Sequence, residues 1–204
     1  EDTLSLHDAL PILAGLQHDE GLDDLAAFVV GHADHRGVGH GGDLGRGHVV
    51  GEADLAETQF NEFVRLVDKP LINLESAMNH PCQALADWKT MDDIDVPRRG
   101  KFVLSWVHHP RALPLAVPAA TVHMAAQRGM DVVVLRPEGY ALPAAVMDKA
   151  RQAAAATGGQ VSETSDRAAA LQGAHVVYAK EWGSPHHYGD AEAEARARAP
   201  LADW

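Results

Sequence analysis

The stretch Lys101–Val107, KFVLSWV, is an almost unbroken apolar run of strand length. A helical pattern over Pro118–Arg128 follows it and stops at Gly129, and Asp131–Arg136 (DVVVLR) is a second apolar run. Strands that are apolar on both faces and alternate with helices are typical of a parallel sheet covered by helices. This stretch therefore predicts an α/β fold with a doubly wound parallel sheet.

The same alternation continues toward the end of the chain. We predict helices over Pro143–Thr157 and Ser165–Gln172, the latter capped by Ser165 or Asp166, and strands over Gln160–Glu163 and His175–Ala179. We expect the strands at 101–107, 131–135 and 175–178 to be parallel, since crossovers through a helix join parallel strands. In such sheets ligands lie outside the carboxyl ends of the strands. The charged run 191–199 (AEAEARARA) indicates a solvated helix or a frayed end.

Before this region lies the segment 71–87, LINLESAMNHPCQALAD, which predicts a short strand followed by a helix from Pro81. Proline suits a first helical position, and Asn79 or His80 suits the cap before it. His80 and Gln83 are three residues apart and share one side of the first turn. Beside free helix N–H groups they suit a polar carbonyl or an anion, although an ordinary capped surface helix has the same spacing.

The wording of this segment, His-Pro-Cys-Gln-Ala-Leu-Ala-Asp, resembles the His-Pro-x-Gln-x-Leu-x-Asp signature of the aspartate/ornithine transcarbamylase family. Further similarity, closest to the branch that acts on N-acetyl- or N-succinyl-ornithine, covers most of residues 55–190. It is carried by residues 101–118, 132–142 and 174–184. The resemblance implies a transcarbamylase-like fold that comprises the C-terminal part of the carbamoyl phosphate domain and an incomplete ornithine-binding domain.

The resemblance also implies the site. His80 and Gln83 would be catalytic and hold the carbamoyl group of carbamoyl phosphate. Pro81 and Cys82 would complete that pocket, with no metal and no cofactor. Three residues would line the acyl-ornithine pocket, namely Glu75, His109 and Lys180.

The residue type at position 180 indicates which substrate is preferred. In ordinary ornithine transcarbamylases an aspartate at this position pairs with the α-ammonium of ornithine. A lysine would repel that charge, by a few kcal/mol in a partly desolvated site. The inverted sign predicts carbamoylation of N-acetyl- or N-succinyl-ornithine, as in arginine biosynthesis.

Phosphate-binding parts of the family are absent from this sequence. The Ser-x-Arg-Thr-Arg and His-Cys-Leu-Pro segments are missing, and four arginines stand at unmatched positions: Arg65, Arg98, Arg99 and Arg111. We therefore expect a chain truncated at both ends and inactive alone, from a parent that forms homotrimers. The alternative is a non-catalytic α/β amino-acid-binding or regulatory module. A nicotinamide-dependent oxidoreductase is disfavoured because no Gly-x-Gly-x-x-Gly follows the predicted strands.

Composition limits the partners. The 204 residues carry a formal charge of −12, which disfavours nucleic acid and anionic membranes as partners. No apolar run reaches the ~18 residues that a membrane span needs. The single cysteine, Cys82, cannot form an internal disulfide, and this fits a cytoplasmic protein.

We divide the chain into residues 1–50, 51–96 and 97–204, with the two transcarbamylase-like domains meeting in the polar stretch 92–100. Residues 1–50 are expected to be non-native or disordered. Their first twelve residues resemble translated adapter sequence, and the segment 31–48 is too rich in glycine for a stable helix or strand. Its histidines lack the spacing of a known metal site.

Overall fold

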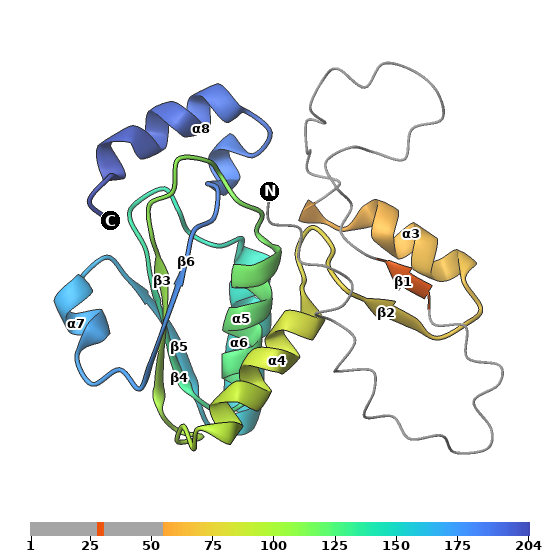
Figure 1. Cartoon of the computed structure of the whole chain (residues 1–204), viewed down its shortest axis with the longest axis horizontal. Helices are drawn as coiled ribbons and strands as arrows, with labels where there is room; N and C mark the ends of the chain where they lie inside the picture. Colours follow the sequence, from red (N-terminus) through yellow and green to blue (C-terminus); the bar gives the residue numbers. More distant parts are fainter. Residues whose placement is uncertain (1–27, 31–54) are drawn as a thin grey trace.

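The structure is a computed structural model that describes residues 28–30 and 55–204. Its main sheet has four parallel strands in the order β5-β4-β3-β6 (Figure 1). The strands are β3 (Lys101–Trp106), β4 (Asp131–Leu135), β5 (Gln160–Thr164) and β6 (Val176–Lys180). The register pairs Phe102 with Val132 on one side and with Val176 on the other. The predicted parallel α/β sheet is therefore confirmed.

Helices cover both faces of this sheet, as its apolar central strands require. Three lie on one face, α4 (Pro81–Asp93), α5 (Ala116–Gln127) and α6 (Ala144–Thr157), whereas α7 (Arg167–Leu171) lies on the other (Figure 1). The larger buried cluster joins Trp106, Val122, Met147 and Trp182. Burial of such side chains contributes roughly 1.5–3 kcal/mol each. Helix α8 (Ala191–Arg198) lies across the carboxyl ends of the strands.

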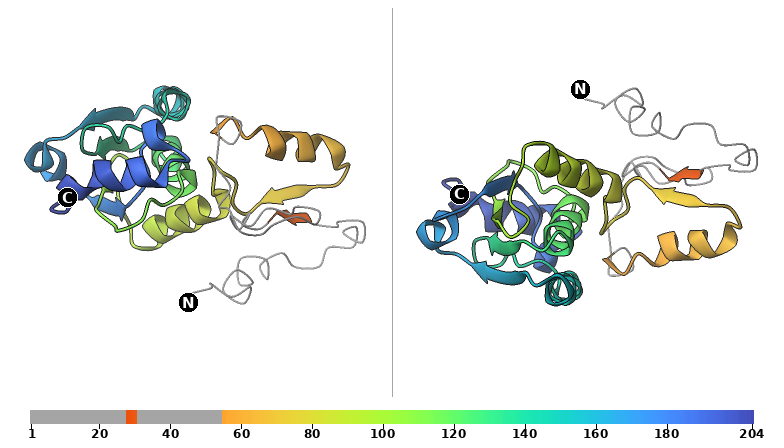
Figure 2. Two further views of the ribbon diagram at one scale, coloured as in Figure 1. Left: turned by 90° about the horizontal axis from the view of Figure 1, so that it is seen from above. Right: turned by 90° about the horizontal axis from the view of Figure 1, so that it is seen from below.

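A smaller unit lies beside the sheet domain (Figure 2). It contains α3 (Thr58–Leu66) and β2 (Leu71–Asn73), and β2 pairs in parallel with β1 (Phe28–Val30). Strand β1 lies within residues 1–50, which we expected to be non-native or disordered. The rest of that segment, including its histidines, lies outside the described residues.

Helix α4 connects the two units and packs against α5. Its Ala84 and Met91 belong to the larger buried cluster. The helix continues through Asp93, so the polar stretch 92–100 begins inside a helix and is a turn only from residue 94 onward. The buried Arg128 donates to the Val96 carbonyl (2.6 Å), which holds this turn against the sheet domain.

The structure corrects our expectation for residues 191–199. They form α8 and a following 3-10 turn (Ala199–Leu201), but the helix is neither frayed nor solvated on all sides. Glu194 and Arg198 are both buried, 4% and 3% exposed. Charged residues four apart share one helix face, and here that face packs over the strand ends.

Candidate functional site

The order in which the strands are added to the sheet reverses at β3. From β3 the chain proceeds outward to β4 and β5, whereas β6 returns to the opposite side of β3. Ligands of doubly wound sheets bind at this switch point, outside the carboxyl ends of the strands. Trp106 and Lys180 are register partners at these ends. The topology therefore places Lys180 at the edge where a ligand is expected.

His80 is the N-cap of α4, as predicted, and its ring is oriented by the helix itself. Its Nδ1 accepts from the Gln83 backbone N–H at 3.4 Å. A neutral ring that accepts at Nδ1 carries its proton on Nε2. Nε2 is therefore a donor, which is the role that a carbonyl oxygen requires.

Glu75 connects this helix start with β6. Its Oε2 lies 4.0 Å from His80 Nε2, and both side chains are largely buried, 21% and 24% exposed. Burial lowers the pKa of Lys180, and the nearby charges of Glu181 and Glu75 oppose that shift. The structure thus brings together Glu75, His80 and Lys180, which are distant in sequence.

Gln83 faces a carboxylate one helical turn further on. Its Nε2 donates to Asp87 Oδ1 at 2.8 Å. Asp87 in turn lies near Tyr178 of β6, where burial and then the Asp87 charge raise the pKa of the phenol to about 12. Asp87 and Tyr178 were not predicted as site residues, although Asp87 ends the quoted motif.

The turn that carries Glu75 is fixed by Glu57, another residue that sequence reasoning missed. Glu57 Oε1 accepts from the Ser76 hydroxyl and from the Met78 backbone N–H, the latter at 3.0 Å. Asn73 Nδ2 donates to the same hydroxyl at 2.9 Å. No sequence pattern signals this contact, because the residues lie about twenty positions apart.

The two remaining carbamoyl-pocket residues are part of the same helix start. Pro81 is the first residue of α4. The Cys82 thiol lies 3.8 Å from the Asn73 carbonyl oxygen, and burial raises its pKa. It is therefore held as a neutral thiol, which is a poor nucleophile.

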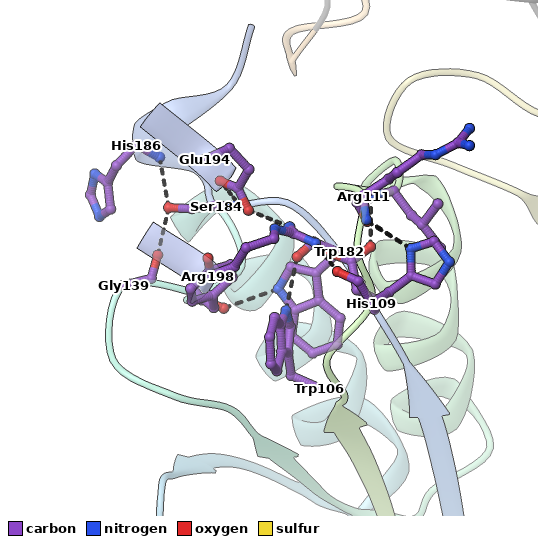
Figure 3. Close-up of polar contacts among 12 residues, drawn as sticks. Trp106, His109, Arg111, Gly139, Trp182, Ser184, His186, Glu194 and Arg198 are labelled. Atoms are coloured by element: carbon purple, nitrogen blue, oxygen red, sulfur yellow. Dashed lines mark hydrogen bonds and ion pairs between the residues drawn. The ribbon is translucent and has the colours of Figure 1, made fainter. Parts of the chain in front are cut away.

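His109 lies three residues beyond the end of β3. Its side chain is exposed, and its Nδ1 lies 3.1 Å from the Arg111 backbone nitrogen. Its carbonyl oxygen accepts from Arg198 Nη1 at 2.7 Å (Figure 3). The structure therefore fixes the backbone of His109 and leaves its imidazole at the surface.

Arg198 lies at the centre of a buried polar cluster behind the strand ends (Figure 3). Its Nη2 donates to Glu181 Oε1 at 2.7 Å and also to Glu194 Oε1. Glu181 Oε2 accepts from the Leu113 backbone N–H at 2.6 Å. The loop after β3, which carries His109, and the loop that follows Lys180 at the end of β6 are thereby joined to each other and to α8.

Two of the unmatched arginines lie away from the site. Arg99 donates to the Gly158 carbonyl at 2.7 Å, at the amino ends of the strands. Arg98 pairs with Asp92 at 3.3 Å. Both arginines therefore lie near the amino ends of the strands, whereas Lys180 lies at a carboxyl end.

Within residues 28–30 and 55–204 there is no cluster of three or more metal-binding side chains. In the same part of the chain no helix is long and apolar enough to cross a membrane.

Comparison with known proteins gives a consistent result. Residues 117–203 match the family model for the Asp/Orn-binding domain of aspartate/ornithine carbamoyltransferase. The N-acetylornithine carbamoyltransferase of Xanthomonas campestris pv. campestris is 36% identical over 149 residues, which is 71% of this chain and 44% of the relative. The N-succinylornithine carbamoyltransferase of Bacteroides thetaiotaomicron is 32% identical over 131 residues, 64% of this chain and 38% of the relative.

Solved structures agree with these relatives. An acetylornithine transcarbamylase complexed with acetylcitrulline superimposes with a TM-score of 0.69 at 34% identity, over 74% of this chain and 46% of that one. A variant N-acetyl-L-ornithine transcarbamylase complexed with carbamyl phosphate and N-succinyl-L-norvaline gives 0.68 at 35% identity and the same coverage. The chain spans less than half the length of these relatives. With its parallel sheet and its His-Pro-x-Gln-x-Leu-x-Asp helix start, the chain belongs to the aspartate/ornithine carbamoyltransferase family.

Proposed function

We propose that the protein containing this chain transfers the carbamoyl group of carbamoyl phosphate to the side-chain amine of N-acetyl- or N-succinyl-ornithine, as in arginine biosynthesis. The observation that carries the proposal is the position of Glu75, close to His80 at the helix start and to Lys180 at the end of β6. A carbamoyl-binding motif and a cation suited to an acylated substrate thus lie in one place.

In the proposed reaction the neutral amine attacks the carbonyl carbon of carbamoyl phosphate. A C–N bond forms, the C–O bond to phosphate breaks, and the leaving phosphate takes up the proton that the amine loses. The His80 Nε2–H would donate to the carbonyl oxygen while negative charge develops on it. Gln83 would bind the carbamoyl NH2, and the Pro81–Cys82 backbone would close the pocket.

Lys180 would recognise the second substrate. An acylated α-nitrogen carries no charge, so the α-carboxylate or a succinyl carboxylate is free to pair with the ammonium. Glu75 would lie between the two substrates, and His109 would reach the acyl-ornithine only if its exposed ring turned toward Lys180. Neither the contacts nor the relatives favour acetyl over succinyl.

The domain division belongs to the same proposal. Residues 51–96 would contribute to the carbamoyl phosphate domain and residues 97–204 to the ornithine-binding domain of a cytoplasmic homotrimer. Because this sequence lacks the family's Ser-x-Arg-Thr-Arg segment, we expect the chain by itself to form no measurable citrulline derivative.

A chimera tests the proposal. Residues 70–204 would replace the matching segment of the X. campestris relative, which supplies the rest of its own longer chain. We expect the chimera to carbamoylate an N-acylated ornithine faster than free ornithine, and Lys180→Asp to shift the preference toward free ornithine. A folded but inactive chimera would favour a non-catalytic binding module, and a preference for free ornithine would reject the substrate assignment.

A further inference from the structure

We infer that Asp87 is a positioning residue that fixes the side-chain amide of Gln83, so that Gln83 presents its oxygen and not its nitrogen to the carbamoyl group. The inference rests on the proposed function. It assigns to Asp87 the discrimination between carbamoyl phosphate and acyl phosphates, such as acetyl phosphate, that lack an NH2 group.

The orientation of the amide follows from the chemistry of its partner. Gln83 Nε2 lies 2.8 Å from Asp87 Oδ1, and an ionised carboxylate only accepts hydrogen bonds. The amide nitrogen must therefore face Asp87. Oε1, on the other branch of the same planar group, is then directed away from the carboxylate.

Asp87 also lies beside Tyr178 of β6. Its Oδ2 is buried and has no hydrogen-bond partner within ordinary geometry among the described residues. The carboxylate is close enough to Tyr178 for its charge to raise the pKa of that buried phenol. Tyr178 and Lys180 are two residues apart and share one face of β6. Asp87 therefore connects the carbamoyl-binding helix start with the strand that carries Lys180.

This orientation matches one ligand. The carbamoyl group offers a carbonyl oxygen that accepts and an NH2 that donates. His80 Nε2–H supplies the donor, and Gln83 Oε1 supplies the acceptor. A flipped amide would set NH2 against NH2. A site built to bind an N–H discriminates against an analogue without one, since a polar group of the site is then left unpaired.

NMR of the whole chain, labelled with nitrogen-15, tests the orientation without any need for activity. We expect the Gln83 side-chain N–H signals to be shifted downfield and protected from solvent exchange, and Asp87→Asn to weaken both features. Asp93→Asn is the matched control, because Asp93 lies on the same helix and pairs with Lys89 instead. Gln83 signals that respond equally to both substitutions, or to neither, would overturn the inference.

The selectivity is measured in the chimera described above, with carbamoyl phosphate and acetyl phosphate as competing ligands. We expect Asp87→Asn to reduce the preference for carbamoyl phosphate about tenfold, the effect of about one hydrogen bond. The double variant Gln83→Glu with Asp87→Asn reverses the internal hydrogen bond while an acceptor still faces the ligand, so it should recover the preference.

An unchanged preference in Asp87→Asn would overturn the inference even if activity fell. If the chimera binds neither phosphate while the NMR response to Asp87→Asn remains, the proposed function fails and the amide orientation stands. The two failures are therefore distinguishable.

Discussion

Replacing Arg198 by methionine should be among the most destabilising single changes in this chain. The guanidinium is 3% exposed and is hydrogen-bonded to Glu181, Glu194 and the His109 carbonyl. Methionine fills much of the volume but leaves two buried carboxylates without their cation. Removal of one partner of a buried ion pair typically costs about 3–5 kcal/mol. We expect a loss of this size in the free energy of unfolding, measured by urea denaturation at neutral pH.

The loss should depend on pH in a defined direction. Burial already raises the pKa of Glu181, against the opposing effect of Arg198, and removal of the guanidinium should raise that pKa further. A buried carboxyl is tolerated better when protonated, so the folded variant binds protons more readily than the unfolded chain. Stability of Arg198→Met should therefore recover as pH falls through the raised pKa of Glu181.

Helix α8 offers a matched control. Arg196 pairs with Glu192 at 3.6 Å with the same four-residue spacing, but the two side chains are 70% and 90% exposed. Exposed pairs contribute about 0.3–0.5 kcal/mol, so Arg196→Met should be nearly neutral. Neutralising both carboxylates in Arg198→Met with Glu181→Gln and Glu194→Gln should restore part of the loss. Equal effects of Arg198→Met and Arg196→Met would refute the reasoning.

Three further predictions follow from other contacts. Hydrogen bonding to Arg128 lowers the pKa of Asp92. The ionised carboxylate therefore stabilises the fold above the ordinary carboxyl pKa, and this stability is lost as pH falls through the lowered pKa. Asp92→Asn should flatten the acid side of a curve of unfolding free energy against pH, and an unaltered acid side would contradict this. Gly159→Ala should destabilise by about 1–3 kcal/mol in urea denaturation, because a Cβ there would lie 2.4 Å from the Met130 carbonyl oxygen. Absorbance titration should show Tyr178 ionising at about pH 12. Because burial also raises the pKa of Tyr140 to about 12, Tyr178→Phe should reduce the amplitude of that transition, and an unchanged amplitude would contradict this.

The strands and helices of the sheet domain could be predicted because their signals are local. Apolar runs such as 101–107 and 131–136, bounded by turn residues and alternating with helices, are typical of strands covered on both faces, and Pro81 with His80 marks a helix start through backbone chemistry alone. The predicted ends of the helices were less accurate. Helix α5 begins two residues earlier than predicted, at Ala116, where no side chain caps the helix start. Helix α4 extends through Asp93, into the polar stretch where we expected the two domains to meet.

The candidate site likewise contains residues that a local pattern predicts and residues that only the tertiary structure brings together. The motif from His80 to Asp87 can be found in the sequence because its residues share one helix turn and the next. The electrostatic interaction between Glu75 and Lys180 joins residues over a hundred positions apart, and the return of β6 to the far side of β3 brings them near each other.

Sequence alone determined the alternation of elements, the capped helix start and the sign of the charge at position 180, since each depends on residue type and short spacing. Tertiary structure decided which polar groups are buried together. Glu57, Asp87 and Arg198 are ordinary charged residues in the sequence, and α8 has the composition of a solvated helix. Their importance arises only from desolvation, which makes an unpaired charge costly once other elements cover it.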